Sequence, residues 1–292
     1  LVSTDKFGIA PANTTLRIGY RINTTDDVNA AQQTITNVDR PIVNFTSAGS
    51  LSSALRSSVI NSLEVTNEEP FVGSVSLPSS EEVKQRVFGF YATQNRAVTL
   101  EDYQALSYAM PGKFGMVKRV SAVRDFDELK RNINLYVISE DSSQKLQAAN
   151  VTLKNNLRNW ILQYKVINDT IDILDAQIVN FGINYVIVPD LNANRFDVIN
   201  RVNQAIRNYL VKNQYDIGEN IIITDFYKIA NGVKGVVDVV DLEIVRRSGG
   251  TYSNSSYDFD GKLSADGRKI MAEQNTIFEL KFPNLDIKGA IQ

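Results

Sequence analysis

Cysteine and histidine are both absent from the 292 residues of this sequence, and these absences exclude much of enzyme chemistry. Histidine is the commonest general base and the usual partner of a nucleophilic serine or cysteine, so neither a Ser-His-Asp nor a Cys-His triad can form. Zinc sites of cysteine and histidine, haem held by either residue and iron–sulfur clusters held by cysteine are excluded for the same reason. We expect no metal and no cofactor, and any catalysis would have to use carboxylate, lysine, tyrosine or N-terminal groups.

The sequence also lacks a surplus of positive charge and a long hydrophobic run. Lysine and arginine number 31 against 33 aspartates and glutamates, which gives a net charge of -2 and no bulk attraction for a polyanion. No segment approaches the roughly 18 apolar residues of a membrane-spanning helix, and no secretory signal opens the chain. We predict no binding to nucleic acid or membrane and no small-molecule substrate. Because Leu1 stands where a methionine would start a protein, we expect a piece of a longer polypeptide.

The length predicts about two domains, at roughly 150 residues for each. Residues 1–76 are rich in serine, threonine and asparagine, and we predict a β-rich segment that continues from a missing N-terminal portion. Its clearest strand covers residues 15–23, where apolar and polar residues alternate. Apolar residues at helical spacing also predict a helix over residues 51–63.

Residues 77–116 are predicted to form a pair of helices. Hydroxyl groups that can accept helix-start N–H bonds, followed by acids, occur at residues 79–82 and again at residues 99–102. Pro111 ends the second helix, because proline cannot continue the helical hydrogen bonds.

From residue 117 to residue 248 the patterns alternate between strands and helices, in one or two subdomains. The predicted strands cover residues 117–124, 133–139, 179–188 and 236–245. The predicted helices cover residues 146–164 and 196–210, with a shorter one capped by Thr224. Residues 249–292 are predicted to be an extended C-terminal tail with a strand-like run at 276–282. Together these patterns predict an α+β fold of small sheet-and-helix units, with strands interleaved with helices.

The most specific local pattern lies at the start of the second predicted helix. It consists of Arg96, Ala97, Val98, Thr99, Leu100, Glu101, Asp102 and Tyr103. Thr99 is predicted to cap the helix, and Asp102 stands at the position from which a capping-box acid reaches back to the cap, where glutamate or glutamine is more usual. Taken alone, these residues describe a well-built helix start.

The same residues resemble the Arg-Ala-Val-Thr-x-x-Asp-Tyr pattern of the baseplate J-like proteins of contractile phage tails. The order of the later segments is similar to that family from residue 16 to residue 245, including a Gly-x-Val-Lys-Arg run at residues 115–119. The C-terminal segment, with Phe278 to Pro283 and Asp286-Ile287, is similar to the C-terminal portion of the larger baseplate wedge subunits of T-even-type phages.

This resemblance implies a structural component of the virion rather than an enzyme. It implies a protein that pairs with itself as a dimer or ring, binds other baseplate wedge proteins and surrounds the tail hub. Such rings are expected to change diameter when the tail engages its host and so to release sheath contraction. The resemblance also implies a location in the tail baseplate after assembly in the host cytoplasm.

An assembly protein concentrates its binding energy in a few buried aromatic and arginine side chains. We predict the interface among the aromatic residues of the C-terminal segment. They are Tyr252, Tyr257, Phe259, Phe278 and Phe282. The alternative for such residues is packing within their own domain, since aromatic side chains also dominate ordinary cores.

A second hypothesis is a cell-wall-degrading glycosidase of a phage tail, which would use two carboxylates and no histidine. Such enzymes hold two acids about 5 to 9.5 Å apart, one of them in an apolar environment that raises its pKa. Asp238 is the one acid that the sequence embeds in an apolar run, between Val236 and Val240. Acid pairs such as Glu81-Glu82 and Glu101-Asp102 are better explained by the first turn of a helix, where the dipole favours negative charge.

Overall fold

The computed structural model describes residues 30, 33–46, 49, 51–68, 75–125, 132–141 and 143–292. Within these residues the fold is mixed α+β, with strands and helices interleaved, which confirms the predicted fold class. Two four-stranded sheets and one short two-stranded sheet form its framework. The strand predicted at residues 15–23 lies outside the described residues.

The first sheet is organised around β2, which pairs with all three of its neighbours. Its strands are β1 (Arg119–Arg124), β2 (Asn132–Glu140), β3 (Leu146–Gln147) and β4 (Thr170–Asp175). β1 and β3 run antiparallel to β2, whereas β4 runs parallel to it. The parallel pair is joined through α4 (Val151–Ile161), whose buried residues Leu153, Leu157 and Ile161 recur at helical spacing and contribute to the core of this unit.

Two helices precede this sheet, as predicted. α2 (Ser80–Thr93) and α3 (Leu100–Tyr108) each begin with a capping box, and a short 3₁₀ turn, η1 (Gly112–Phe114), follows them. α3 packs between α2 and β1 and buries Tyr103 and Leu106 in the core. α2 lies outside α3 and buries only Thr93.

The second sheet is organised around the long strand β5. Its strands are β5 (Gln177–Pro189), β7 (Val236–Arg247), β9 (Thr276–Glu279) and β10 (Ile287–Ile291). β7 pairs antiparallel along one edge of β5, and β9 and β10 both pair parallel with β5. Alternate β5 residues such as Phe181, Ile183 and Ile187 are fully buried in the same core as side chains of α5 (Arg195–Lys212) and α6 (Ile223–Asn231).

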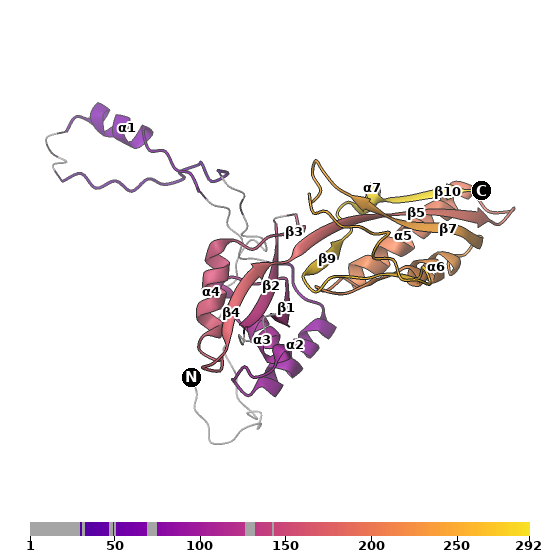
Figure 1. The fold of residues 1–292 in the computed structure, drawn as a ribbon. Coiled ribbons are helices and arrows are strands. Elements are labelled where there is room, and N and C mark those ends of the chain that lie inside the picture. The colour runs from indigo at the N-terminus through magenta and orange to yellow at the C-terminus, as the bar shows by residue number, and fades with distance from the viewer. Residues whose placement is uncertain are drawn as a thin grey trace, which may run out of the picture.

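The two sheets are joined by continuous extended chain. Only Ala176 separates the end of β4 from the start of β5, and Figure 1 shows one strand leading into the other. A small core cluster of Ile138, Ala176, Ile217 and Ile277 contains residues of both units. The joint is therefore built from paired strands and apolar packing, not from a loose linker.

The C-terminal segment differs from the extended tail that we predicted. Residues 249–292 form part of the second unit: they supply β9 and β10, the small strand β8 (Lys269–Ile270), which pairs with β6 (Ile221–Ile222), and the short helix α7 (Pro283–Asp286). A Cβ atom on Gly182 would lie 2.7 Å from Arg247 Nε and 2.8 Å from the Asp286 carbonyl, so this segment packs closely on β5. The prediction failed because a strand that pairs in parallel with a distant strand leaves no local turn signal in the sequence.

The described part of residues 1–76 also differs from the β-rich segment that we predicted. The described part of this segment contains one helix, α1 (Ser53–Asn61), and no strand that pairs with either sheet. Figure 1 shows α1 at the end of a long loop that projects away from both units. The predicted helix over residues 51–63 is confirmed within two residues at each end.

Two predicted helix starts were wrong. The helix predicted at 146–164 begins only at Val151, because Leu146 pairs with β2 and the Asn150 side chain caps the helix. α6 begins at Ile223, one residue before the predicted cap Thr224, and its N-cap Ile222 makes no side-chain bond. Across the described part of the chain, no helix is both long enough and apolar enough to cross a bilayer.

Candidate functional site: the motif helix and the junction between the sheets

The motif residues form the capping box that the sequence predicts. The Thr99 hydroxyl accepts a hydrogen bond from the Asp102 N–H at 3.2 Å, and Asp102 Oδ2 accepts the N–H groups of Thr99 at 2.9 Å and Val98 at 3.0 Å. Aspartate is shorter than glutamate, and here it reaches two successive backbone donors of the turn. Arg96 and Val98 are exposed beside this turn.

The other motif residues attach α3 to the chain that follows α4. Ala97 is fully buried, and its N–H donates to the Tyr164 carbonyl at 2.9 Å in an isolated parallel bridge with Lys165. Tyr103 is also fully buried, and its hydroxyl donates to Asp169 Oδ2 at 2.8 Å. Burial, together with this bond to a carboxylate, raises the pKa of Tyr103 well above its usual value. The motif is thus a joint between two segments that are about 65 residues apart in the chain.

A buried ion pair lies near the junction between the two sheets. Lys118 Nζ lies 2.7 Å from Glu140 Oε1, and both side chains are almost completely buried. Glu140 also accepts the Ser76 N–H at 2.6 Å and the Ser76 hydroxyl at 3.0 Å, while Lys118 Nζ donates to that hydroxyl. Ser76, four residues before α2, is therefore fixed to the C-terminal end of β2 by charged groups that are withdrawn from water.

Arg119 links three parts of the molecule. Its Nη2 lies 2.8 Å from Glu82 Oε1 of α2, and its Nε lies 2.6 Å from Asp216 Oδ1, in the segment that follows α5. Burial acts against ionisation of Glu82, but the bond from the Ser79 N–H and the Arg119 charge together lower the pKa of Glu82. A single guanidinium therefore connects the helical pair, the first sheet and the second unit.

Glu279 makes a second polar link across the junction. This β9 residue accepts the N–H of Leu146 at 2.8 Å and the side-chain amide of Asn180 at 2.7 Å. Burial raises the pKa of Glu279, although both hydrogen bonds act to lower it. The β3 edge of the first sheet is thereby held to β5 and β9 of the second.

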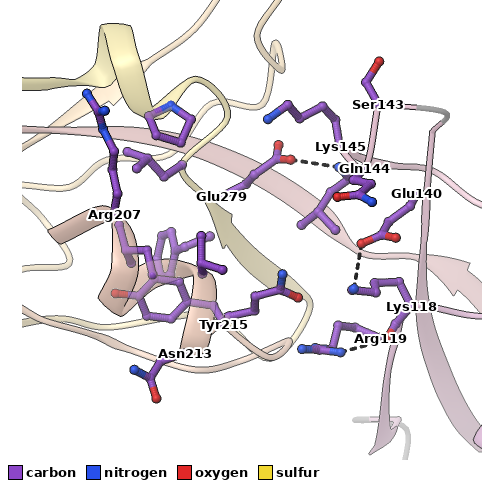
Figure 2. Close-up of a pocket in the computed structure, with 17 residues that line it drawn as sticks. Lys118, Arg119, Glu140, Ser143, Gln144, Lys145, Arg207, Asn213, Tyr215 and Glu279 are labelled. Carbon is purple, nitrogen blue, oxygen red and sulfur yellow. Dashed lines mark hydrogen bonds and ion pairs between the residues drawn. The ribbon is translucent and has the colours of Figure 1, made fainter. Parts of the chain in front are cut away.

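These groups surround a cavity of about 230 Å³ between the two units (Figure 2). Its polar lining includes Lys118, Arg119, Glu140, Lys145, Arg207 and Glu279, and its apolar lining includes Leu146, Leu210, Tyr215, Phe278 and Leu280. Lys145 Nζ lies 5.6 Å from the centre of the Phe282 ring. The Nε atom of Arg207 is buried and has no hydrogen-bond partner in the described part of the structure.

The two carboxylates of this cavity bear on the glycosidase hypothesis. Glu279 has the raised pKa that a general acid needs, and Glu140 lines the same cavity. However, the oxygens of both side chains already accept hydrogen bonds or an ion pair from the chain itself. Asp238, the acid on which the sequence argument depended, is exposed on β7, and its Oδ1 accepts the N–H of the next residue at 2.8 Å. The apolar surroundings expected for Asp238 are therefore absent.

Among the described residues, no three or more aspartates and glutamates lie close enough together to hold a metal ion.

The five aromatic residues predicted to form an interface pack against one another within the chain. Tyr257 and Phe278 are buried, with ring centres 5.6 Å apart, and Phe259 lies 5.7 Å from Tyr257. Tyr252 and Phe282 form a second edge-to-face pair at 5.4 Å, and the Tyr252 hydroxyl donates to Asp286 at 2.6 Å. The structure thus places Tyr257 and Phe278 in the core of the second unit, while Tyr252, Phe259 and Phe282 stay half-buried.

The sequence reasoning missed the charged residues of the junction. In the sequence, Lys118 and Arg119 stand out only as part of the Gly-x-Val-Lys-Arg run, and no motif marks Glu140 or Glu279 as a site residue. The available signal was the charged residue at the end of an otherwise apolar strand, as in Ile138-Ser139-Glu140 and Ile277-Phe278-Glu279. A charge in that position predicts a buried partner, but it does not identify that partner.

Comparison with known proteins finds similarity among solved structures. No protein-family model and no curated protein matches this chain. The chain is similar to a chain in the cryo-EM structure of the anti-feeding prophage baseplate, with 13% sequence identity and a TM-score of 0.40. The match covers 75% of this chain and 45% of that chain, so this chain spans less than half of that protein's length.

Proposed function

We propose that this chain is a structural component of the baseplate of a contractile phage tail, and that it acts as a wedge protein without catalytic activity. The observation that carries the proposal is that the residues of the Arg96–Tyr103 motif have a structural role in this chain. Through these residues the chain resembles the baseplate J-like family. Ala97 and Tyr103 hold two distant segments together, Asp102 caps the helix, and none of the three forms a chemical site. A motif with that role suits a protein whose function lies in its shape and its contacts.

The proposal includes self-association and contacts with other wedge proteins in a ring around the tail hub. It also includes transmission of a conformational change to the sheath. The junction supports this part, because β4 runs into β5 and Arg119 ties α2 to the second unit. A displacement of one unit would then move the other rather than bend a linker between them.

The experiment that tests the proposal is protein analysis of tail particles from the source of this sequence. Particles are purified on a density gradient and dissociated, and peptides of this chain are quantified against those of a known tail protein. We expect the chain in every tail-containing fraction, in a fixed and multiple copy number. Its absence from purified tails, with the chain abundant in the lysate, would contradict the proposal.

A glycosidase is the second candidate function, because Glu279 has a raised pKa and lines the same cavity as Glu140. A peptidoglycan-release assay of the parent chain tests this candidate, with Glu279→Gln and Asp238→Asn as variants. We expect no release by the parent. Release that Glu279→Gln abolishes would replace the structural proposal with the enzymatic one.

A further inference from the structure

The projecting N-terminal segment is built like an element that needs a partner. We use the name "arm" for residues 33–46 and 51–67, which include α1. In the described part of the arm, Asn67 is the one buried residue. It accepts hydrogen bonds from the N–H groups of Gln33 and Ile35, on the opposite side of the arm. No described residue of the arm contributes to a core cluster.

α1 lacks the support that a helix of its length requires. It has nine residues and buries none of them. Helices shorter than about 12–15 residues are marginal in water on their own, and most helical stability in proteins comes from packing of an apolar face. α1 and its flanks carry such a face, because Leu51, Leu55, Val59 and Leu63 recur at every fourth position. Leu55 is 58% exposed and Val59 is 48% exposed.

A second unpartnered apolar face lies on α2. Val83, Val87 and Tyr91 follow one another at every fourth position, and their exposures are 43%, 62% and 82%. Phe88, beside them, is 78% exposed. The opposite side of the helix, where Gly89 approaches Ala105, faces α3. Four large apolar side chains in one stripe are more than scattered surface hydrophobics and indicate a binding surface.

We propose that α1 of one copy docks on the exposed face of α2 of a second copy of this chain. Both faces are apolar stripes with helical spacing, so they can pack as two helices do when one fills the groove of the other. The inference rests on the proposed function and deepens it, since it assigns the surface by which one subunit holds the next.

The arm has enough residues and little enough charge to be the segment that docks on α2 of a second copy. The arm supplies more than 30 described residues, nearly all of them accessible, and a standard interface uses about 20–30 residues on each side. Arg56 is the single charged residue of α1, so the docked helix would bury little charge. Exchange of a projecting element between identical copies is also a common route to oligomers.

Cysteine cross-linking tests the contact directly, because the chain has no cysteine of its own. Val59→Cys and Val87→Cys are prepared as two separate full-length proteins, mixed and mildly oxidised. We expect a disulfide-linked dimer from the mixture at least tenfold above that from either variant alone. Leu191→Cys mixed with Val59→Cys is the control, since Leu191 is 98% exposed in a loop of the second unit.

Three results would overturn the inference. The first is no linked dimer above the Leu191→Cys control. The second is a linked dimer from Val87→Cys alone, because α2 would then pair with α2. The third is an intramolecular disulfide as the main product in the double variant Val59→Cys/Val87→Cys, because the arm would then fold back onto its own chain.

Sedimentation velocity of the uncross-linked protein supplies an independent readout. We expect Leu55→Asp/Val59→Asp to raise the dissociation constant of self-association at least tenfold, and Leu191→Asp to leave it unchanged. Both variants should keep the parent's unfolding midpoint, since neither touches a core. An unchanged dissociation constant in the arm variant would refute the contact. If tail particles still contain the chain, the proposed function would survive that result.

Discussion

The ion pair of Lys118 with Glu140 shows how a single buried charge depends on its partner. Removing one member leaves the other uncompensated, so we expect Lys118→Met and Glu140→Gln each to lower the free energy of unfolding by about 3–5 kcal/mol. The double variant should lose much less than the sum of the two, because it leaves no unpaired charge. Urea unfolding of all four proteins measures this coupling. Additive losses would show that the two groups do not interact.

Two glutamates on opposite sides of the junction should respond to pH in opposite directions. The pKa of Glu82 is lowered in the folded protein, so its stabilising contribution is present above the unfolded pKa, near 4.3, and is lost as the pH falls through the folded value. The pKa of Glu279 is raised, so its ionisation opposes folding as the pH rises through the folded value. We therefore expect the cost of Glu82→Gln to grow from pH 3 to pH 7 and the cost of Glu279→Gln to shrink.

Unfolding measured between pH 3 and pH 7 checks both signs, and each variant serves as the control for the other. Parallel pH dependences for the two variants would show that the assigned environments of the carboxylates are wrong.

At the scale of single elements, the motif helix α3 depends on one buried hydroxyl. Tyr103→Phe removes the bond to Asp169 and leaves an oxygen of that half-buried carboxylate without its donor. Because the acceptor is charged, we expect a loss of about 1.5–3 kcal/mol in the free energy of unfolding. Tyr91→Phe, on the exposed face of α2, is the matched control and should change stability by less than about 0.5 kcal/mol. Equal effects of the two substitutions would contradict the role of the motif as a joint.

The elements that sequence patterns predicted are those whose signals are local. The alternation of β5, the apolar stripe of α5 and the capping boxes of α2 and α3 all depend on residues within one or two turns. Leu146 was misplaced because its spacing to Ala149 fits a helix, whereas its actual partner is β2. The role of the C-terminal segment was missed for the same reason, since β9 and β10 pair with a strand about 100 residues earlier.

The candidate site was predictable in part. The capping box of Thr99 and Asp102 follows from residue types alone, and so does the burial of an aromatic residue such as Tyr103 on the inner face of α3. Three features follow only from the tertiary arrangement. They are the acceptor of the Tyr103 hydroxyl, the links from Arg119 to both α2 and the second unit, and the ion-pair partner of Glu140. The spacing of residues in the sequence gives no information on contacts between residues that are so far apart in the chain.

At the scale of the whole molecule, the C-terminal segment cannot be removed without loss of the second unit. Truncation after Ser248 deletes β9 and β10 together with the buried residues Tyr257, Phe278 and Ile287. We expect the truncated chain to lose the cooperative unfolding transition of the second unit while the first unit keeps its own. Near-UV circular dichroism and urea unfolding report this difference.

A native-like transition in the truncated chain would show that the segment is an appendage after all. The matched comparison is removal of the arm, residues 33–67 being replaced by a short linker. We expect that deletion to leave both transitions unchanged, because no described residue of the arm belongs to a core.

If this chain is a structural part of a tail baseplate, as we propose, it must lie at the baseplate in intact particles, and its position there can be measured. Gold-labelled antibodies raised against the purified chain are applied to tails with extended and with contracted sheaths and viewed by electron microscopy. We expect label at the baseplate end of the tail in both states and none along the sheath or at the head. Label elsewhere on the particle, or none on permeabilised tails that bind a control antibody, would contradict it.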